Sequence, residues 1–273
     1  MQTILVLNGE KYWQDYLPEF TVVQKKIQDS DFILKDKKLF VVDNEGVCAP
    51  DLIIWRLGAI SPNWKHRTAL EIIKSSNVVC VNSAETLLQG YDRLSMLHVL
   101  SNLGMPVIPF QVVTHSRLLK NIAMSFPFVV KVGNYHGGYG KVLVQNTEKW
   151  QDIQDLLFVT NDYSTIEPYI DYQFDIRYLI VKDKVWAMQR KGQFWKSNVL
   201  TNEFQLIEVS SIWETRIRKV SNHLKADILA LDVLIDKEGN EFIVEYNDIP
   251  GLSGFPEMVQ LEMIQIIKEK IEV

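Results

Sequence analysis

Short runs of consecutive hydrophobic residues, separated by polar stretches, fill the first part of the chain. Unbroken apolar runs of this length are typical of strands that are buried on both faces of a parallel sheet. We expect such strands over residues 3–7, 39–42, 51–55 and 78–81. Residues 63–75 have helical character. This alternation of strands with a helix predicts an α/β unit with a parallel sheet, which ends near Gly90.

Amphipathic helices alternate with further strands in the rest of the chain. Helices are expected over residues 91–103, 147–159, 211–224 and from about 256 to the end. Strands are expected over residues 164–170, 175–181, 185–190, 227–236 and 241–247. Ser211 and Glu214 have the spacing of a capping box, so the third of these helices is expected to begin at Ser211.

A glycine-rich loop separates two strand-like runs in FPFVVKVGNYHGGYGKVLVQ. Its glycines are Gly133, Gly137, Gly138 and Gly140. Glycine lets backbone N–H groups approach phosphate oxygens, but Val142 stands where a Walker A loop needs Ser or Thr. The loop returns as a strand, so we expect a flap over a nucleotide; a flexible hairpin with solvated lysines is the alternative. Lys131 favours the flap, because a lysine inside an apolar strand needs a partner such as phosphate, and Lys141 adds positive charge after the loop.

Two acidic residues and an asparagine fall within the predicted hairpin over residues 227–247. If Glu238 and Gly239 form a two-residue turn, Lys237 pairs with Asn240, and the residue numbers of every later pair add up to the same sum. Asp232 then lies opposite Glu245. Asn247 then shares their face. Hard oxygen ligands in such a cluster favour Mg²⁺ bound with nucleotide phosphates. The alternative is a solvent-facing edge, which the apolar flanks LALDVLI and EFIVEYN oppose, although a one-residue slip in register would separate the two carboxylates.

Three cationic residues lie between the loop and the acidic hairpin: Arg177, Arg190 and Lys196. Arginine forks match phosphate or carboxylate groups bidentately. For any one of these residues alone, a surface salt bridge is the expected role.

Composition and charge narrow the functional classes. The 273 residues carry 29 Lys and Arg against 34 Asp and Glu, a formal net charge of −5, which disfavours a general nucleic-acid binder. Cys48 and Cys80 form no C-x-x-C pair and are expected to be buried free thiols in a reducing compartment. We see no signal peptide and no apolar run long enough for a membrane span, so we expect a cytoplasmic protein without a membrane partner.

The ordered motifs resemble the ATP-grasp superfamily, first the synapsin ATP-binding domain and next the RimK-type carboxylate–amine ligases. The resemblance rests on VNSAETL, FPFVVKVGNYHGGYGKVLVQN, IEPYIDYQFDIRYLI, AMQRKGQFWKSN and LALDVLIDKEGNEFIVEYNDIPG, which follow the family order over about residues 80–252. It implies an α/β ATP-grasp fold in which two α+β lobes sandwich ATP, behind an N-terminal pre-ATP-grasp lobe. The implied lobes are residues 1–90, 91–165 with the glycine-rich loop, and 166–273 with the metal site.

The resemblance also implies a set of ATP-binding residues. These are Arg93, Lys131, Gly137, Gly138, Gly140, Lys141, Glu167, Tyr169, Ile170 and Asp175. Lys131 is implied to contact the α- and β-phosphates, and Asp175 to reach the ribose. Glu167, Tyr169 and Ile170 are implied to meet the edge of the adenine ring. Arg93 stands where the family has a lysine at the start of a helix, which keeps the charge but changes its geometry.

A reaction centre is implied beside the nucleotide. Arg190 and Asn198 are implied to face the γ-phosphate and the acyl-phosphate position, and Asp232, Glu245 and Asn247 to hold Mg²⁺. RimK-type ligases follow their asparagine with an Arg-Gly-Gly stretch that this chain lacks, which bears on the specificity for acid and acceptor. Synapsins lack the full Asp…Glu-x-Asn set that this chain has.

These features predict an ATP-dependent carboxylate–amine or carboxylate–thiol ligase. ATP would phosphorylate a substrate carboxylate to an acyl phosphate and release ADP, and an amine would then attack, forming an amide or peptide bond and releasing phosphate. The alternatives are a synapsin-like ATP-binding regulatory protein without turnover, an ATP-grasp kinase, and an unrelated α/β protein. The expected partners are ATP, Mg²⁺, a carboxylate and an amine acceptor, which is a small molecule or a peptide. The oligomeric state is left open, with a homo-oligomer as one alternative, because ATP-grasp proteins of this type are frequently dimers or tetramers.

Overall fold

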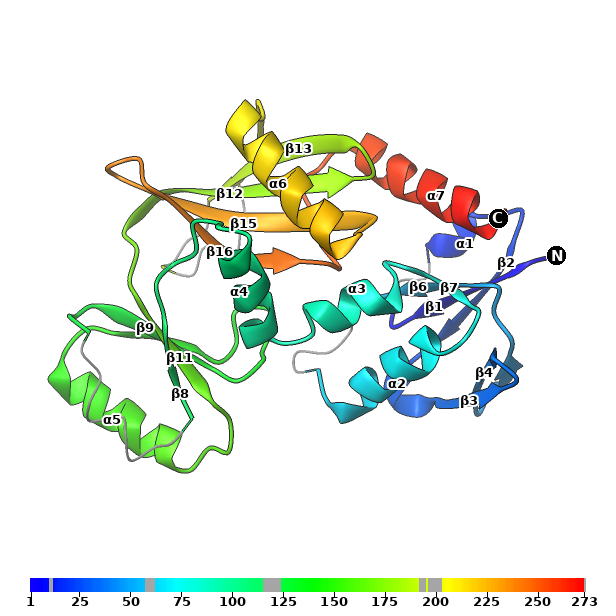
Figure 1. The fold of residues 1–273 in the computed structure, drawn as a ribbon, viewed down its shortest axis with the longest axis horizontal. Coiled ribbons are helices and arrows are strands. Elements are labelled where there is room, and N and C mark those ends of the chain that lie inside the picture. Colours follow the sequence, from blue (N-terminus) through cyan, green and yellow to red (C-terminus); the bar gives the residue numbers. More distant parts are fainter. Residues whose placement is uncertain (10–11, 57–61, 115–123, 192–194, 196–202, 273) are drawn as a thin grey trace.

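A computed structural model describes residues 1–273 except 10–11, 57–61, 115–123, 192–194, 196–202 and 273 (Figure 1). Within the described residues, four sheets form three lobes, with the N-terminal lobe at one end and the glycine-rich loop's lobe at the other. A five-stranded sheet lies between them along the chain's long axis (Figure 1).

The N-terminal lobe is built on a parallel sheet with strand order β2-β1-β6-β7. Its strands are β1 (Thr3–Leu7), β2 (Thr21–Lys25), β6 (Leu52–Trp55) and β7 (Val79–Val81). Its helical segments are α1 (Trp13–Tyr16), the 3-10 helix η1 (Ile27–Asp29), α2 (Trp64–Lys74) and α3 (Ala84–Gln89). All four residues of β6 are buried, as the unbroken apolar run predicts.

Residues 39–42 do not join this parallel sheet, so that prediction is wrong. They belong to a separate antiparallel sheet of β3 (Asp31–Lys35), β4 (Lys38–Asp43) and β5 (Gly46–Cys48). Asp36 and Lys37, between β3 and β4, have φ of 50° and 61°, which suits the two-residue turn of a twisted hairpin. Neither residue is glycine, so this turn has little signal in the sequence, and β2 takes the parallel edge instead.

The central lobe carries an antiparallel sheet with strand order β10-β9-β11-β8. Its elements are β8 (Gln111–Val113), β9 (Phe128–Val132), β10 (Lys141–Val144), α5 (Thr147–Phe158) and β11 (Ser164–Pro168). The strand–loop–strand prediction for the glycine-rich segment is confirmed, and α5 packs on the sheet through Ile153 and Leu157. The expected lobe boundary at residue 165 falls inside β11, so we propose a boundary after Pro168.

The C-terminal lobe has a five-stranded antiparallel sheet with strand order β14-β13-β12-β15-β16. Its elements are β12 (Tyr172–Val181), β13 (Lys184–Lys191), β14 (Glu203–Ile207), α6 (Ser211–Leu224), β15 (Ile228–Asp236), β16 (Glu241–Asn247) and α7 (Glu257–Ile271). The helix α6 begins at Ser211, as expected, but the residue that caps it differs from the prediction. Ser210, rather than Ser211, is the N-cap, and its side chain accepts a hydrogen bond from the Trp213 N–H.

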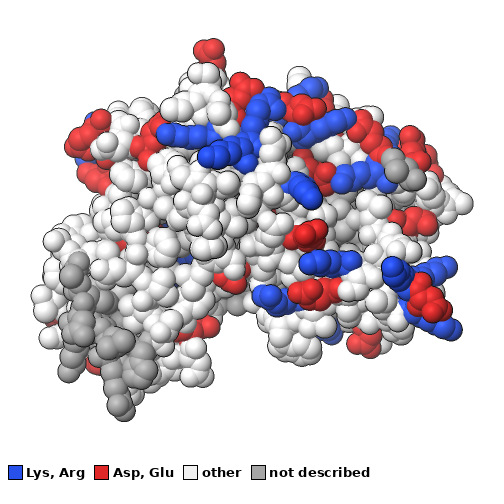
Figure 2. Space-filling model, viewed as in Figure 1, with Lys and Arg blue, Asp and Glu red and all other residues white. Residues whose placement is uncertain are grey.

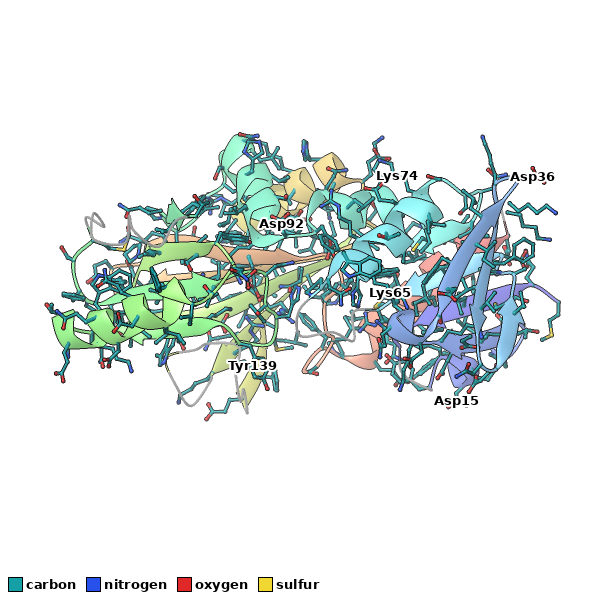
Figure 3. All side chains as sticks on the ribbon, turned by 90° about the horizontal axis from the view of Figure 1, so that it is seen from below. Asp15, Asp36, Lys65, Lys74, Asp92 and Tyr139 are labelled. Carbon is teal, nitrogen blue, oxygen red and sulfur yellow. The ribbon has the colours of Figure 1, made fainter. Side chains whose placement is uncertain are left out.

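Helices cover both faces of this sheet. Tyr178 and its same-face neighbours pack against α6 and α4 (Arg93–Asn102), whereas Leu179 and Val181 face α7. The α7 side chains also join the core of β1 and β6, so α7 fastens the sheet to the N-terminal lobe (Figure 1). The helix α4 was assigned to the central lobe by sequence, but it packs on the five-stranded sheet. Figure 3 shows its first residues near Asp92 in the middle of the molecule.

The distribution of surface charges and the state of the two cysteines agree with what the composition predicts. Lys and Arg mix with Asp and Glu over the five-stranded sheet and the N-terminal lobe, whereas the central lobe shows few charges on the face in Figure 2. Cys48 and Cys80 are both buried and free, as expected. Among the described helices, none is both long and apolar enough to cross a membrane.

Candidate nucleotide and metal site

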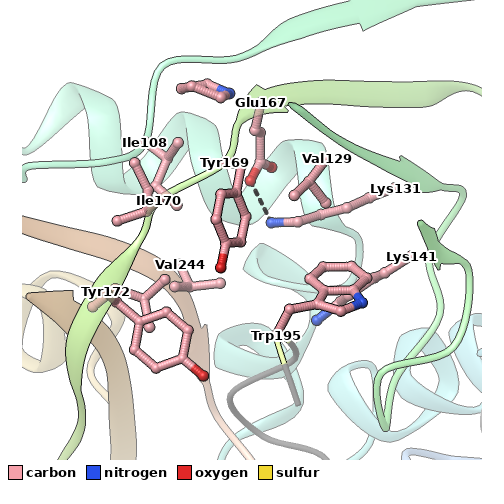
Figure 4. A pocket seen from close by; sticks show the side chains of 12 residues that line it. Ile108, Val129, Lys131, Lys141, Glu167, Tyr169, Ile170, Tyr172, Trp195 and Val244 are labelled. Carbon is pink, nitrogen blue, oxygen red and sulfur yellow. Dashed lines mark hydrogen bonds and ion pairs between the residues drawn. The ribbon is translucent and has the colours of Figure 1, made fainter. Parts of the chain in front are cut away.

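A cleft lies between the sheet of the central lobe and the β15–β16 part of the five-stranded sheet (Figure 4). Its apolar lining comes from Ile108, Val129, Pro168, Ile170, Leu234 and Val244. Tyr169 and Tyr172 direct their rings into it, and Lys131 and Lys141 approach from β9 and β10 (Figure 4). An apolar slot with charged groups on one side suits a planar ring that carries a charged chain.

Lys131 has a buried partner within the chain. Its Nζ lies 2.5 Å from Glu167 Oε2, and only 5% of the lysine is exposed. Because β9 and β11 are neighbours, the two side chains lie diagonally across adjacent strands. Burial lowers the pKa of Lys131 to about 8, although the Glu167 carboxylate opposes this shift. The sequence leaves the partner of Lys131 open, and the structure supplies the Glu167 carboxylate of the chain itself.

Three cations, Lys131, Lys141 and Arg93, surround the Glu245 carboxylate. Lys141 lies directly opposite Lys131 in the β9–β10 pair, and its Nζ is 3.9 Å from Glu245 Oε2. Arg93, at the start of α4, approaches the same oxygen to 3.9 Å through Nη1. Its guanidinium is 6% exposed, and within the described residues neither Nε nor Nη1 has a hydrogen-bond acceptor. Buried N–H donors without acceptors suit an anionic ligand such as phosphate.

The glycine-rich loop closes over this cationic end of the cleft. All its glycines have positive φ, between 53° and 80°: Gly133, Gly137, Gly138 and Gly140. A side chain at Gly140 would also approach the Val132 carbonyl oxygen to 3.0 Å. The backbone conformation therefore requires glycine at these positions. The loop is held at Asn134, whose Nδ2 donates to the Tyr91 carbonyl at 2.8 Å, and the exposed Tyr139 lies at the lower edge of the view in Figure 3.

Asp232 and Glu245 face each other across β15 and β16, as predicted, but by a different register. The hairpin loop is longer than the two-residue turn assumed, because Asp236 N–H donates to the Asn240 carbonyl. The residue numbers of pairs near the turn, such as Val233 with Ile243, add up to one less than those of Asp232 with Glu245. A bulge between Asp232 and Val233 restores the register, so the assumption of a constant index sum is wrong.

Two arginines contact Asp232 through cross-strand pairs. Arg177 lies opposite Asp232 in the β12–β15 register and binds it bidentately, with Nε–Oδ1 and Nη2–Oδ2 distances of 2.8 Å. Arg190 lies opposite Asp175 in the β12–β13 register and donates to Asp175 Oδ1 at 2.6 Å. Its Nη2 is also 3.2 Å from Asp232 Oδ1. The surface salt bridges expected for these arginines taken singly are instead a buried network.

The network sets the charge of its carboxylates. Burial alone would raise the pKa of Asp232, but Arg177 and Arg190 outweigh it and hold that pKa below its usual range. Lys141 and Arg93 likewise lower the pKa of Glu245 against the effect of burial. Burial raises the pKa of Asp175, despite the nearby Arg190. Asp232 and Glu245 are therefore both ionised at neutral pH.

The donor set fits a hard divalent cation. Two ionised carboxylates lie on adjacent strands, and Asn247 lies beside them with Nδ2 3.2 Å from Asp232 Oδ2. Turning that amide over would present its oxygen at the same place. No group of three or more His, Cys, Asp or Glu residues forms a metal site within the described part of the chain. The residues thus suit Mg²⁺, which completes its coordination with phosphate and water.

Five residues singled out by sequence line the cleft directly: Lys131, Lys141, Glu167, Tyr169 and Ile170. Arg93, Glu245, Asp232 and Arg190 lie beside them, in the ion pairs described above. Asp175 is paired with Arg190 and almost fully buried, so its reach to a ribose stays a prediction. Asn198 and Lys196 lie outside the described residues.

Sequence reasoning missed several residues of this cleft. The sequence identifies Arg177 only as a cation with an expected surface salt bridge, because its partner Asp232 is 55 positions away and only the β12–β15 register brings them together. Trp195, Tyr172 and Ile108 also line the cleft. The aromatic character of Trp195 beside the QRKGQFWKSN motif was the one local signal for it.

Comparisons with known proteins place the chain among nucleotide-binding proteins. The family "Synapsin, ATP binding domain" matches residues 91–269. Synapsin of Drosophila melanogaster is 26% identical over 215 residues, which are 73% of this chain but only 21% of that protein. A probable alpha-L-glutamate ligase of Aeromonas salmonicida is 25% identical over 213 residues, 75% of this chain and 71% of the relative.

Solved structures cover nearly the whole chain. D-alanyl-alanine synthetase A from Vibrio cholerae superposes with a TM-score of 0.74 at 13% identity, over 99% of this chain and 97% of that one. A RimK domain ATP-grasp protein from Sphaerobacter thermophilus gives 0.71 at 14% identity, over 100% of both chains. A RiPP-associated ATP-grasp ligase from Chryseobacterium gregarium gives 0.70 at 13% identity, over 99% and 97%. The expected ATP-grasp fold is confirmed.

Proposed function

The chain belongs to the family of the synapsin ATP-binding domain, and we propose that it is an ATP-dependent ligase that joins a carboxylate to an amine. The observation that carries this proposal is the facing pair Asp232 and Glu245, ionised and set beside Arg190 at the cationic end of the cleft. Two carboxylates beside an arginine suit a metal ion and a transferring phosphoryl group. The ligase names and folds of several relatives support the same reading.

The nucleotide would lie along the cleft. The apolar slot between Val129 and Leu234 would take the adenine ring, with Tyr169 and Ile170 at its edge. Lys131, Lys141 and the unsatisfied Arg93 donors would bind the phosphates beneath the glycine-rich loop. This orientation directs the triphosphate toward Asp232 and Glu245, because the cations and the carboxylates meet at that end.

Asp232, Glu245 and Asn247 would hold Mg²⁺, which supplies neutralisation of phosphate charge when bound. Arg190 would place its guanidinium beside the transferring phosphoryl group, held in position by Asp175 at 2.6 Å. Asn198, in the same motif, would help to orient the acyl phosphate.

Two bond exchanges would make up the reaction. A carboxylate oxygen of the substrate attacks the γ-phosphorus, and the bond to the β–γ bridging oxygen breaks, which releases ADP. The amine nitrogen then attacks the acyl carbon, phosphate leaves, and the nitrogen loses a proton. No side chain of the protein forms a covalent bond, so much of the rate enhancement would come from positioning and charge. A thiol acceptor would follow the same sequence and form a thioester.

A synapsin-like ATP-binding role without turnover is the second candidate. It is favoured by the family match and by the pairing of each cleft carboxylate with cations of the chain itself. An ATP-grasp kinase would use the same first step but release the phosphorylated product. A kinase would give a phosphorylated product and the regulatory role would give no product, so mass spectrometry separates both candidates from a ligase.

Purified protein incubated with Mg·ATP and a desalted cell extract tests the proposal. A ligase gives ADP and a new species whose mass equals two extract components minus water. The Asp232→Asn variant should form neither, whereas Asp171→Asn, which removes an exposed carboxylate paired with Lys237, should behave as wild type. A product that gains only phosphate would indicate a kinase. Saturable ATP binding without any product would leave the regulatory role.

A further inference from the structure

Arg177 takes no part in the reaction proposed above, yet it makes the closest contacts of Asp232. We propose that Arg177 suppresses metal binding at Asp232 in the nucleotide-free protein, so that the metal enters the site together with nucleotide phosphates. The inference rests on the proposed function, because it takes Asp232 to be a metal ligand. It goes beyond that function by naming Arg177 as a residue that determines whether metal or nucleotide can bind first.

Donors of the protein occupy most of the Asp232 carboxylate in this arrangement. Oδ1 accepts a hydrogen bond from Arg177 Nε at 2.8 Å, and Arg190 Nη2 lies 3.2 Å from the same oxygen as an ion pair. Oδ2 accepts from Arg177 Nη2 at 2.8 Å and from Asn247 Nδ2 at 3.2 Å. Two carboxylate oxygens offer about four acceptor positions, and three hydrogen bonds fill all but one of them. A metal ion at Asp232 would therefore compete with Arg177 for the carboxylate.

Arg177 differs from Arg190 in how its charge is balanced. Arg190 has Asp175 as a second carboxylate, at 2.6 Å, so its charge is already balanced without Asp232. Among the described residues, Arg177 hydrogen-bonds to Asp232 and, at 3.4 Å, to the neutral Gly251 carbonyl oxygen, while Glu245 and Asp175 act on it only through longer-range charge. Its side chain is also the more exposed of the two, at 16% against 6%. Arg177 is thus the arginine that depends more on Asp232 for its counter-charge, and its charge opposes a metal ion there.

The net charge of the whole cleft also disfavours a metal ion that binds without nucleotide. Among the described residues, the five cations introduced above face four carboxylates, which leaves one excess positive charge before any ligand binds. A divalent cation alone adds two more positive charges in a buried place, which is unfavourable. Nucleotide phosphates reverse the balance, because their negative charge exceeds this excess. Metal and nucleotide should therefore bind with positive coupling, and removal of Arg177 should weaken that coupling.

Binding of Mn²⁺ as the probe metal, followed by electron paramagnetic resonance of the free ion, tests this inference. Nucleotide-free wild type should bind Mn²⁺ weakly, and Arg177→Met and Arg177→Gln should bind it at least about tenfold more tightly, because each removes the opposing charge. With an ATP analogue that has a methylene group between the β- and γ-phosphates, the difference between wild type and variants should shrink. Arg177→Lys retains the charge and should stay close to wild type.

A thermal unfolding series gives a readout independent of turnover. Arg177→Met and Arg177→Gln leave Asp232 short of a counter-charge, so both should melt earlier than wild type in EDTA and recover with Mn²⁺ alone. Wild type should show little response to Mn²⁺ alone. Arg216→Met removes an arginine from a carboxylate of β16, Glu241, outside the cleft; it should melt earlier without any recovery by Mn²⁺. If Arg177→Met does not fold, Arg177→Gln carries the test.

Two results would overturn the inference, and they differ in what else they reject. Equal Mn²⁺ affinity of wild type and the neutral variants without nucleotide would reject the role of Arg177 alone, and the ligase proposal would stand on its turnover assay. Failure of wild type to bind Mn²⁺ even with the nucleotide analogue would reject both the metal site and the inference.

Discussion

The N-terminal lobe and the cleft both bury a lysine beside a carboxylate, but the surroundings of the two pairs differ. Lys25 of β2 contacts the Asp43 carboxylate and, at 3.1 Å, the Gly46 carbonyl oxygen, and so joins the parallel sheet to the β3–β4–β5 sheet. This group is balanced within itself, with one cation and one anion. Lys131 of β9 pairs with Glu167 in a cleft that holds more cations than anions and a guanidinium with unsatisfied donors.

The difference separates a structural ion pair from a binding site. A balanced pair stabilises the two elements that it joins and leaves nothing for a ligand to satisfy. The cleft leaves positive charge and N–H donors that are satisfied only when an anion arrives. Substitutions in the two regions should therefore affect different measurements.

The largest effect is expected at the carboxylate pair of the cleft. Asp232→Asn should lower the rate of ADP formation by about 10³-fold, because it removes a charge that organises both the metal and the arginines. Coupled measurement of ADP release under saturating Mg·ATP checks this. Turnover at more than a tenth of the wild-type rate would contradict the role of Asp232.

A smaller effect is expected at the phosphate-binding lysine. Lys131→Met should weaken ATP binding by about 100-fold, because it removes a charged hydrogen-bond donor from the cationic end of the cleft. Isothermal titration with ATP measures the change. Lys237→Met is the matched control, since this lysine pairs with Asp171 at an exposed position, and its affinity for ATP should equal that of wild type.

The dependence of ATP binding on pH should be smaller still. Lys131 has a pKa lowered to about 8, so its ammonium charge is present below pH 8 and is lost as the pH rises through that value. The affinity for ATP should therefore fall by up to about eightfold between pH 7.5 and 9. Lys131→Arg keeps its charge over this range and should give a flatter profile. An affinity that rises with pH in wild type would contradict the assignment.

The sequence predicts those features of the cleft that depend on local patterns. The glycine-rich loop and the facing pair Asp232 and Glu245 follow from local patterns: four glycines between apolar strands, and one hairpin with a short loop. The bulge next to Asp232 could not be predicted from the sequence. It offsets the shift in pairing that the longer loop causes, so Asp232 and Glu245 pair as they would with a two-residue turn and no bulge.

Long-range register accounts for most of the remaining differences. Arg177 and Asp232 meet only because β12 and β15 are neighbours, and no local pattern determines which strands of a five-stranded sheet are adjacent. The parallel sheet contains β2 where the sequence predicts residues 39–42, which form β4, and this difference has a similar origin. An apolar run indicates a buried strand without stating its partner, and the Asp36-Lys37 turn that decides the pairing lacks glycine.

The smallest functional effect is expected in the N-terminal lobe, where it tests the comparison most directly. Lys25→Met keeps most of the side-chain volume but leaves Asp43 and the Gly46 carbonyl without their cation. The melting temperature should fall by about 5 °C, whereas the affinity for ATP and the rate of ADP formation should stay within about twofold of wild type. Lys131→Met should show the opposite pattern, with a large loss of ATP affinity. If Lys25→Met lowers ATP affinity as much as Lys131→Met does, the Lys25 pair supports the cleft as well as the fold, and charge balance does not distinguish the two regions.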